Sequence, residues 1–365
     1  MWPDRRLVDL FGIEQPVVLA PMAGLGTVGL AAAVCDAGGL GSIGCATMQP
    51  PIAAETIEQL RRLTRKPINV NFFCHAEAKI DAVRERTWHD RLSPYFVELG
   101  LPQELSPPRL TIEPFGDAMC KVVEAAKPEV VSFHFGLPAP PLLARIKAAG
   151  CRIISSATTV EEALWLEARG VDAVIAQGCE AGGHRATFLA ANPNLAAAWQ
   201  VGTLALVPQI VDAVNVPVIA AGGIGDGRGI AAAFALGAAG AQIGTAFLFC
   251  PEAATSSLHL AALRRARENV TVITNVFTGR PARVLANRLV LDIGPVLDDA
   301  PDFPLPMGEI SRLRADAEQQ GHSDFTPLWS GQAAPLAMEM SATAFTLKLA
   351  SETMECFARL RPVTA

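Results

Sequence analysis

The sequence is poor in tyrosine and has no long uninterrupted hydrophobic run. Tyr95 is the single tyrosine among 365 residues. The longest apolar stretches are interrupted by Gly, Asp, Asn or Pro, so none of them predicts a membrane-spanning helix. Residues 1–6 contain charges and a proline but no apolar core of a secretory signal. We therefore expect a cytoplasmic protein without a membrane segment.

Patterns that predict metal sites or disulfides are also absent. The eight cysteines are scattered without a C-x-x-C pair, and the six histidines show neither H-x-x-x-H nor H-E-x-x-H spacing. Most of the cysteines lie in apolar runs, where cysteine behaves as a small hydrophobic residue. We expect neither a metal site nor a disulfide framework, in keeping with a reducing compartment.

Charge is sparse and has no basic block. Charged residues make up 18% of the chain and hydrophobic residues 50%, with a net charge of −6. This composition predicts a densely packed globular protein and argues against nucleic acid or an anionic membrane as a partner. The length suits one large domain or two of ordinary size.

Short β-rich runs alternate with Ala- and Leu-rich stretches at helical spacing. Alternating strands and helices predict a parallel sheet. Eight such units over about 250 residues predict an α/β fold, the (β/α)8 TIM barrel. The expected strands are residues 16–20, 40–43, 68–71, 130–134, 152–155, 173–177, 217–220 and 241–244.

A doubly wound dinucleotide-binding sheet is the alternative, because residues 24–29 match G-x-G-x-x-G after the first strand. However, Pro21 and Met22 separate that strand from the glycines. The next strand also ends without the acidic residue that would hold a ribose. We therefore interpret the glycines as a loop that opens the first barrel helix.

Two regions do not follow the alternation. Residues 76–127 are too long for a simple crossover, and the repeat stops after about residue 250. We expect residues 1–75 and 128–250 to form the barrel. Residues 76–127 and 251–365 are expected to form a mainly helical cap over the C-terminal ends of its strands, where barrel active sites lie.

The most informative loop follows the expected sixth strand. Gln177 ends this strand, and Gly182, Gly183 and His184 come shortly after it. Glycines there allow a backbone to approach a flat or anionic ligand, and a histidine beside them can exchange a proton with that ligand.

The loops after the last two strands predict a phosphate site. Residues 221–227 are glycine-rich and open a helix, and residues 242–245 include Gly244 and Thr245. We expect free N–H groups at that helix N-terminus to bind an anion. A phosphate site after strands seven and eight recurs in this fold.

Other strand ends indicate which phosphate compound binds. Pro21 and Met22 end the first strand, Asn69 and Asn71 the third, and Gln177 the sixth. Amide side chains both donate and accept hydrogen bonds, which suits the N–H and C=O edge of a flavin better than a sugar phosphate. The pattern therefore predicts flavin mononucleotide (FMN).

Four segments resemble the signature segments of class I nitronate monooxygenases, formerly called 2-nitropropane dioxygenases. They are Leu-Ala-Pro-Met at 19–22, Asn-Val-Asn-Phe-Phe-Cys-His at 69–75, residues 131–138, and residues 177–185. The resemblance covers about residues 10–250 and continues weakly to 329–332. Glu-Ala-Gly-Gly-His at 180–184 also resembles related FMN-dependent enoyl reductases.

The resemblance implies a capped barrel that binds FMN non-covalently, with His184 as the catalytic histidine. His134 matches the family's second active-site histidine, although a buried histidine satisfied by backbone is an equal alternative. The family's flavin contacts correspond to Ala20, Pro21, Met22, Asn69, Gln177, Gly182, Gly183, Gly222, Gly223, Gln242, Ile243, Gly244 and Thr245.

The chain departs from the family in the cap. Phe303 and Met307 stand where members of the family carry tyrosines over the substrate. We therefore expect both side chains to line a substrate pocket that is more apolar than usual.

The implied activity is the oxidation of alkyl nitronates or nitroalkanes by O2 to a carbonyl compound and nitrite. His184 would hold the anion when protonated, or remove the α-proton of a neutral nitroalkane when neutral. The alternatives are an NAD(P)H-dependent FMN quinone or enoyl reductase and a non-catalytic FMN-binding protein. A homodimer is a candidate assembly. A sugar-phosphate enzyme is disfavoured, because no lysine or pair of carboxylates follows the strands.

Overall fold

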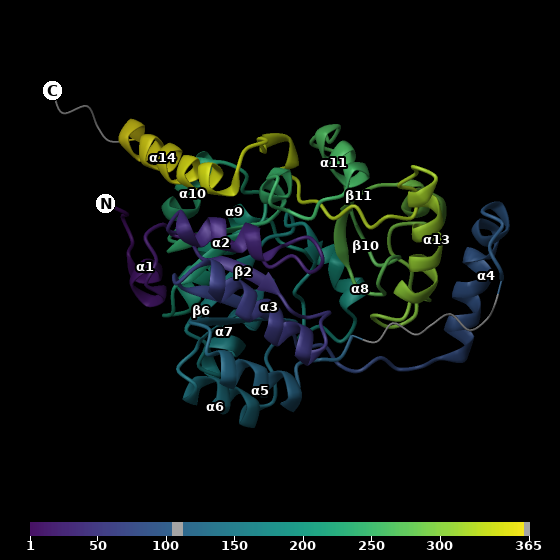
Figure 1. The fold of residues 1–365 in the computed structure, drawn as a ribbon, viewed down its shortest axis with the longest axis horizontal. Helices are drawn as coiled ribbons and strands as arrows, with labels where there is room; N and C mark the ends of the chain where they lie inside the picture. The colour runs from purple at the N-terminus through teal and green to yellow at the C-terminus, as the bar shows by residue number, and fades with distance from the viewer. Residues whose placement is uncertain (104–111, 361–365) are drawn as a thin grey trace.

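The barrel predicted from the sequence is present in the computed structural model, which describes residues 1–103 and 112–360 (Figure 1). Eight parallel strands are hydrogen-bonded in the order β1-β9-β8-β6-β5-β4-β3-β2. A parallel bridge between Val18 and Leu40 joins the two ends of this order and closes the barrel. The strands are β1 (Val17–Leu19), β2 (Gly41–Gly44), β3 (Ile68–Phe73), β4 (Val130–His134), β5 (Arg152–Ala157), β6 (Ala173–Gln177), β8 (Val218–Ala221) and β9 (Gly240–Ile243).

The strands are buried on both faces, which explains their continuous apolar runs. In β3, Ile68, Val70 and Phe72 belong to the core between the strands and the surrounding helices. Asn69 and Asn71 alternate with them and are also buried. Because strand side chains alternate between faces, these amides belong to the barrel interior.

Among the described residues, seven helices that lie between successive strands surround the barrel. Several begin at a side-chain cap, as when Thr27 Oγ1 accepts a hydrogen bond from the Leu30 amide. Residues 24–29 thus lead into α2, as the sequence predicted. The helices are α2 (Val28–Asp36), α3 (Pro50–Leu63), α5 (Asp117–Ala126), α6 (Pro140–Ala148), α7 (Val160–Ala168), α9 (Thr203–Ala213) and α10 (Gly227–Ala235).

The short helix α1 (Arg6–Phe11) fills one end of the barrel. Leu7, Val8 and Phe11 are buried in one cluster with interior strand residues such as Val18 and Ile219. Since this end is packed with hydrophobic side chains, a ligand can enter the barrel interior only from the opposite end.

A cap lies beside the barrel (Figure 1), and residues such as Trp88, Phe277 and Leu313 form a core of its own. It is partly helical, as expected from the sequence, and contains in addition a three-stranded antiparallel sheet in the order β10-β11-β7. These strands have two to four residues, too few for an alternating pattern to be recognised in the sequence. The elements are α4 (Ala82–Glu98), β7 (Gly183–His184), α11 (Ser257–Arg264), β10 (Thr271–Thr274), β11 (Ala282–Leu285), α12 (Arg288–Ile293) and α13 (Met307–Gln319).

Two helices within the ranges predicted for the cap contact the barrel instead. α5 packs against α3 and α6, and the last helix, α14 (Ala342–Leu360), packs along α10 and α2 (Figure 1). We therefore propose that the barrel domain includes α5 and α14. Short helical segments complete the chain: α8 (Pro193–Ala196), η1 (Ala197–Trp199), η2 (Thr245–Phe249) and η3 (Ala334–Leu336).

Within the described residues, no single helix has the length and apolar character needed to cross a membrane. One pair of helices, Pro193–Trp199 and Thr203–Ala213, meets those criteria of length and composition only when taken together across a bend of 104°.

Candidate functional site

A cavity opens at the C-terminal ends of the barrel strands and is bordered by the cap. Nearly all the site residues predicted from the sequence line it. They are Ala20, Pro21, Met22, His134, Gln177, Gly182, Gly183, His184, Gly222, Gly223, Gln242, Gly244, Thr245, Phe303 and Met307.

Asn69 and Ile243 do not line the cavity. The Asn69 side chain is fully buried and its Nδ2 donates to Ser42 Oγ at 2.9 Å. Asn71, two residues further along the same face of β3, lines the cavity instead. Ile243 lies in the core between the strands and the helices. At these two positions, the side chains that the resemblance assigns to flavin binding therefore lie outside the cavity.

The His184 loop is held against the end of β6 by Gln177. Gln177 Nε2 donates to the His184 carbonyl at 3.0 Å, and Gln177 Oε1 accepts from the Ala186 amide at 2.9 Å. The adjacent Arg185 is buried, and its guanidinium donates to the carbonyls of Gln177 and Gly178 at 2.7 and 2.8 Å. The loop is therefore a rigid support for the His184 ring.

The same loop forms an edge of the cap sheet. His184 pairs with Ala282, and Gly183 with Arg283, in antiparallel register. The candidate catalytic histidine therefore lies where the barrel and the cap meet. Its orientation depends on both.

His134 is oriented by the same backbone. Its Nε2 lies 3.1 Å from the His184 carbonyl, and its Nδ1 lies 3.4 Å from Ser156 Oγ. A carbonyl only accepts, so Nε2 must carry the hydrogen. Burial lowers the pKa of His134 to about 3, which keeps the ring neutral. These contacts are those of a histidine that positions the loop, although its ring also borders the cavity.

His184 is neutral as well. Burial, followed by the neighbouring His134 and Arg280, lowers the pKa of His184 to about 3. Its ring Nε2 lies 2.9 Å from Thr278 Oγ1. Of the two roles expected from the sequence, the neutral ring fits a base that removes a proton and not a cation that holds an anion, and the same burial makes the ring a weak base.

Several glycines that line the cavity have a backbone conformation, or neighbouring atoms, that disfavour any larger residue. Gly222 and Gly223 have φ of +109° and +69°. A Cβ on Gly222 would lie 2.9 Å from the Ala181 amide nitrogen and 3.0 Å from the Gly178 carbonyl oxygen. Gly183 has φ of +72°, and a Cβ there would meet no atom within 4 Å. The backbone is thus exposed to the cavity without intervening side chains.

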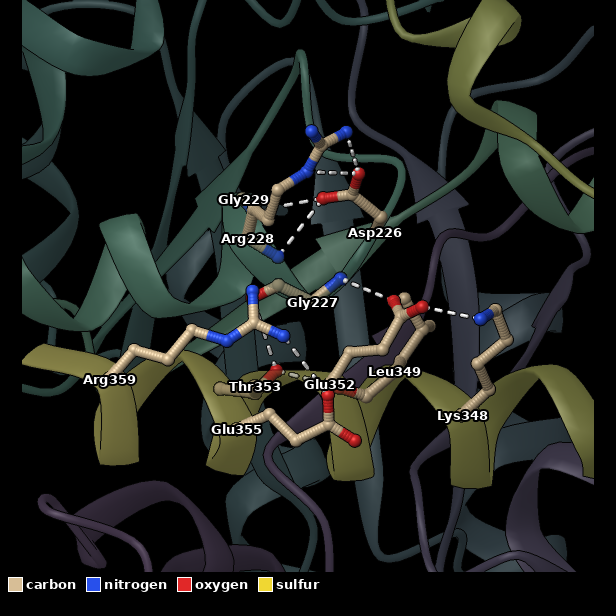
Figure 2. Close-up of polar contacts among 10 residues, drawn as sticks. All are labelled: Asp226, Gly227, Arg228, Gly229, Lys348, Leu349, Glu352, Thr353, Glu355 and Arg359. Carbon is tan, nitrogen blue, oxygen red and sulfur yellow. Dashed lines mark hydrogen bonds and ion pairs between the residues drawn. The ribbon is translucent and has the colours of Figure 1, made fainter.

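The N-terminus of α10 is closed by carboxylates, contrary to the prediction that its N–H groups are free for an anion (Figure 2). The Gly227 amide donates to Glu352 Oε2 at 3.2 Å, and the Arg228 amide donates to Asp226 Oδ1 at 3.0 Å. The preceding loop, with Gly222 and Gly223, borders the cavity instead. An anion in the cavity would therefore meet the loop and not the helix end.

The cavity also has a free polar atom suited to a flavin. Gln242 Oε1 is buried and has no hydrogen-bond partner among the described residues. A buried acceptor without a partner is costly, and a ligand N–H would satisfy it. Within the described residues there is no group of three His, Cys, Asp or Glu that could hold a metal. The donor set therefore fits an organic ligand with an N–H and C=O edge.

Aromatic rings surround His184. Ring centroids of Phe303, Trp329 and Phe73 lie 5.5, 5.4 and 6.1 Å from that of His184. Phe303 and Met307 line the cavity, at the positions named from the sequence. Trp329 and Phe73 are not among the site residues predicted from the sequence, although Phe73 shares the face of β3 with Asn71 and the alternation of strand side chains indicates it.

Comparison with known proteins gives one consistent result. The family model described as nitronate monooxygenase matches residues 4–352. A nitronate monooxygenase of Paraburkholderia phytofirmans is 42% identical over 362 residues, which cover 98% of this chain and 97% of that protein. Another from Pseudomonas aeruginosa is 41% identical over 349 residues, covering 95% and 98% of the two chains.

Solved structures agree with this result. A nitroalkane oxidase from Streptomyces ansochromogenes superposes with a TM-score of 0.89 at 38% identity, covering 98% of this chain and all of that one. The protein FabK from Thermotoga maritima is more distant, with a TM-score of 0.72 and 30% identity over 99% of each chain. The fold, the residues of the site and these similarities agree, and the chain belongs to the nitronate monooxygenase family.

Proposed function

We propose that this protein uses non-covalently bound FMN to oxidise alkyl nitronates and nitroalkanes with O2, releasing a carbonyl compound and nitrite. The observation that carries this proposal is the position of His184 at the edge of a cavity with aromatic walls, at the C-terminal ends of the barrel strands. Membership of the family and the similarity to a nitroalkane oxidase support it further.

Two sets of cavity residues would bind FMN, one its phosphate and the other its ring. The loops after β8 and β9 would take the phosphate, through the backbone of Gly222, Gly223 and Gly244. The strand ends at Ala20–Met22 and β6 and the side chain of Gln242 would take the ring. When bound, the flavin supplies the electron chemistry between substrate and O2.

The residues of this chain handle the proton and exclude water. A neutral nitroalkane is unreactive until its α-proton leaves, and His184 is the neutral base beside the cavity. Gln177 and His134 fix the His184 backbone from the barrel side. Phe303 and Trp329 cover the ring with apolar surface, which keeps water from the reacting carbon.

The decisive experiment mixes the flavin-loaded protein anaerobically with NADH, NADPH or ethyl nitronate and follows the flavin spectrum. We expect the nitronate to bleach the flavin rapidly and both nicotinamides to act slowly. Rapid bleaching by NADH or NADPH, with no response to nitronates, would instead assign the chain to the quinone or enoyl reductases. No response to any of the three would favour a non-catalytic flavin-binding protein.

A variant separates the proton step from the flavin step. His184→Asn should retain FMN but oxidise neutral nitroalkanes about 10²-fold or more slowly, because it lacks the base. Preformed nitronates have already lost the proton, so their oxidation should change less. Equal losses on both substrates would contradict the role of His184 as a base.

A further inference from the structure

The Nε2 atom of His184 contacts a side chain from the cap that no pattern in the sequence indicated. Thr278 lies in the turn between β10 and β11, and its side chain is buried. Its Oγ1 is 2.9 Å from His184 Nε2. Which of these two atoms supplies the hydrogen decides which nitrogen of His184 is free to act as a base.

The other partners of the hydroxyl determine the direction of this bond. Thr278 Oγ1 donates to the Arg280 carbonyl at 3.2 Å and accepts from the Arg280 amide at 3.4 Å. A hydroxyl has one hydrogen and two lone pairs. With its hydrogen on the Arg280 carbonyl, Thr278 can only accept from His184, so Nε2 is the protonated nitrogen.

In the opposite arrangement Thr278 would donate to Nε2, and the hydrogen of the neutral ring would be on Nδ1. Within residues 1–103 and 112–360, no hydrogen bond to Nδ1 is present, whereas Nε2 has Thr278. Nδ1 is not among the buried atoms that lack a partner, so it is open to the cavity, where a substrate can reach it. The tautomer with hydrogen on Nε2 keeps the bond to Thr278 and leaves the Nδ1 lone pair free to take a proton.

The turn that carries Thr278 is rigid. The amides of Thr278 and Gly279 donate to the Asn275 carbonyl at 3.3 and 2.7 Å. Gly279 has φ of +83°, and a Cβ there would lie 2.3 Å from the Pro301 carbonyl oxygen. These hydrogen bonds and the close approach of Gly279 to Pro301 hold the turn, and with it the Thr278 hydroxyl, in place.

Arg280 anchors the other side of the turn. Its guanidinium lies 4.0 Å above the Phe135 ring and donates to the Thr187 carbonyl at 2.6 Å. Its positive charge is one of the causes that disfavour a second proton on His184, after burial and His134. The turn thus fixes the tautomer of the ring and contributes to its neutrality.

We propose that Thr278 is a positioning residue that holds the hydrogen of His184 on Nε2, so that Nδ1 takes the α-proton of a neutral nitroalkane. This rests on the proposed function. The carbon–hydrogen bond of the substrate breaks, its electron pair forms the C=N bond of the nitronate, and the π electrons of the N=O bond move to that oxygen, which takes the negative charge. The proton moves to Nδ1, and the resulting imidazolium keeps its Nε2–H bond to Thr278.

The test compares Thr278→Val, which removes the acceptor, with Thr278→Ser, which keeps the hydroxyl. Both are measured as flavin-loaded protein on a neutral nitroalkane and on its preformed nitronate. We expect Thr278→Val to lower kcat/KM on the neutral substrate roughly tenfold or more relative to the nitronate. In Thr278→Ser, the ratio of kcat/KM on the neutral nitroalkane to kcat/KM on the nitronate should stay close to that of the wild-type protein. If this ratio is also unchanged in Thr278→Val, the proposal is overturned.

A second readout needs no activity. Nitrogen-15 NMR of the flavin-loaded wild-type protein should show His184 with hydrogen on Nε2, its signals assigned by their loss in His184→Asn. Hydrogen on Nδ1 would overturn the proposal even if Thr278→Val fails to fold. If the wild-type protein oxidises neither substrate, the proposed function fails, while the NMR measurement still decides the tautomer.

Discussion

The amide of Gly227 at the start of α10 donates a hydrogen bond to Glu352 of α14 at 3.2 Å (Figure 2). The two helices approach closely, since a Cβ on Gly227 would lie 2.4 Å from Glu352 Cβ. Thr353 Oγ1, which donates to the Leu349 carbonyl at 2.6 Å, also lies 3.3 Å from the Gly227 carbonyl oxygen, and Lys348 pairs with the Glu352 carboxylate. The Glu352 carboxylate of the last helix thus occupies the position at the N-terminus of α10 that an anionic ligand could otherwise take.

Glu352→Ala should therefore weaken the fold but not the binding of flavin. Removing the carboxylate leaves the Gly227 amide without its partner, which we expect to lower the free energy of unfolding by about 1 kcal/mol in urea titrations. Glu355→Ala, on the same helix and paired with Arg359, is the matched control. A clear loss of FMN affinity in Glu352→Ala alone would mean that α10 does contribute to the phosphate site.

The adjacent glycines Gly182 and Gly183 should respond differently to alanine. A Cβ on Gly182 would lie 2.5 Å from the Gly331 amide nitrogen, so Gly182→Ala must displace backbone and should lower the melting temperature of the flavin-free protein. A Cβ on Gly183 would meet no atom within 4 Å. The positive φ of this residue would add a backbone strain of about 1–2 kcal/mol when alanine replaces glycine. Gly183→Ala should therefore mainly weaken FMN binding, measured by the quenching of flavin fluorescence. If Gly182→Ala weakened FMN binding more than Gly183→Ala did, Gly183 would not lie against the flavin.

The barrel could be predicted because its strands are buried on both faces and occur at regular intervals. Each strand is a short β-rich run, and the loop after it contains the glycines and amides of the site. Local sequence thus determines both the strands and the positions of Gln177, His184 and Gly222. A resemblance adds the family but does not determine the exact side chains, as Asn69 and Asn71 show.

What the sequence did not predict depends on contacts between distant segments. Glu352 reaches Gly227 across 125 positions, and Thr278 reaches His184 across 94. The cap sheet takes two residues, Gly183 and His184, from the barrel loop. Such pairings follow from tertiary packing and not from local periodicity, so no reading of hydrophobic pattern would reveal them.

Acid should destabilise the flavin-free protein partly through the two neutral histidines. In the unfolded chain an imidazole takes up a proton as the pH falls through about 6.5. Burial lowers the pKa of His134 and His184 to about 3, so between these pH values the unfolded state binds more protons. The free energy of unfolding should therefore fall with decreasing pH, with about 1.4 kcal/mol per pH unit from each histidine.

Substituting the histidines isolates their contribution to the pH dependence. Between about pH 6 and 4, His134→Gln and His184→Asn should each lower the slope of unfolding free energy against pH by about 1.4 kcal/mol per pH unit, which corresponds to one proton. The double variant should lower the slope by twice as much. Urea titrations at several pH values measure the slope. Variants with the slope of the wild-type protein would show that these histidines are already protonated in the folded state.

The apolar cap predicts a preference for long substrates. Phe303 is buried and packs against His75 and Phe135, with ring centroids 4.8 and 5.9 Å apart, and it lines the cavity together with Met307. Each additional buried CH2 contributes about 0.8 kcal/mol, or about fourfold in kcat/KM. We expect kcat/KM to rise along the primary alkyl nitronates from ethyl to hexyl until the chain outgrows the cavity. Met307→Ser, which adds a hydroxyl and shortens the apolar wall, should flatten the series and leave the value for ethyl nitronate nearly unchanged. A flat series in the wild-type protein would show that neither side chain contacts the substrate, since burial against them would then contribute nothing to its recognition.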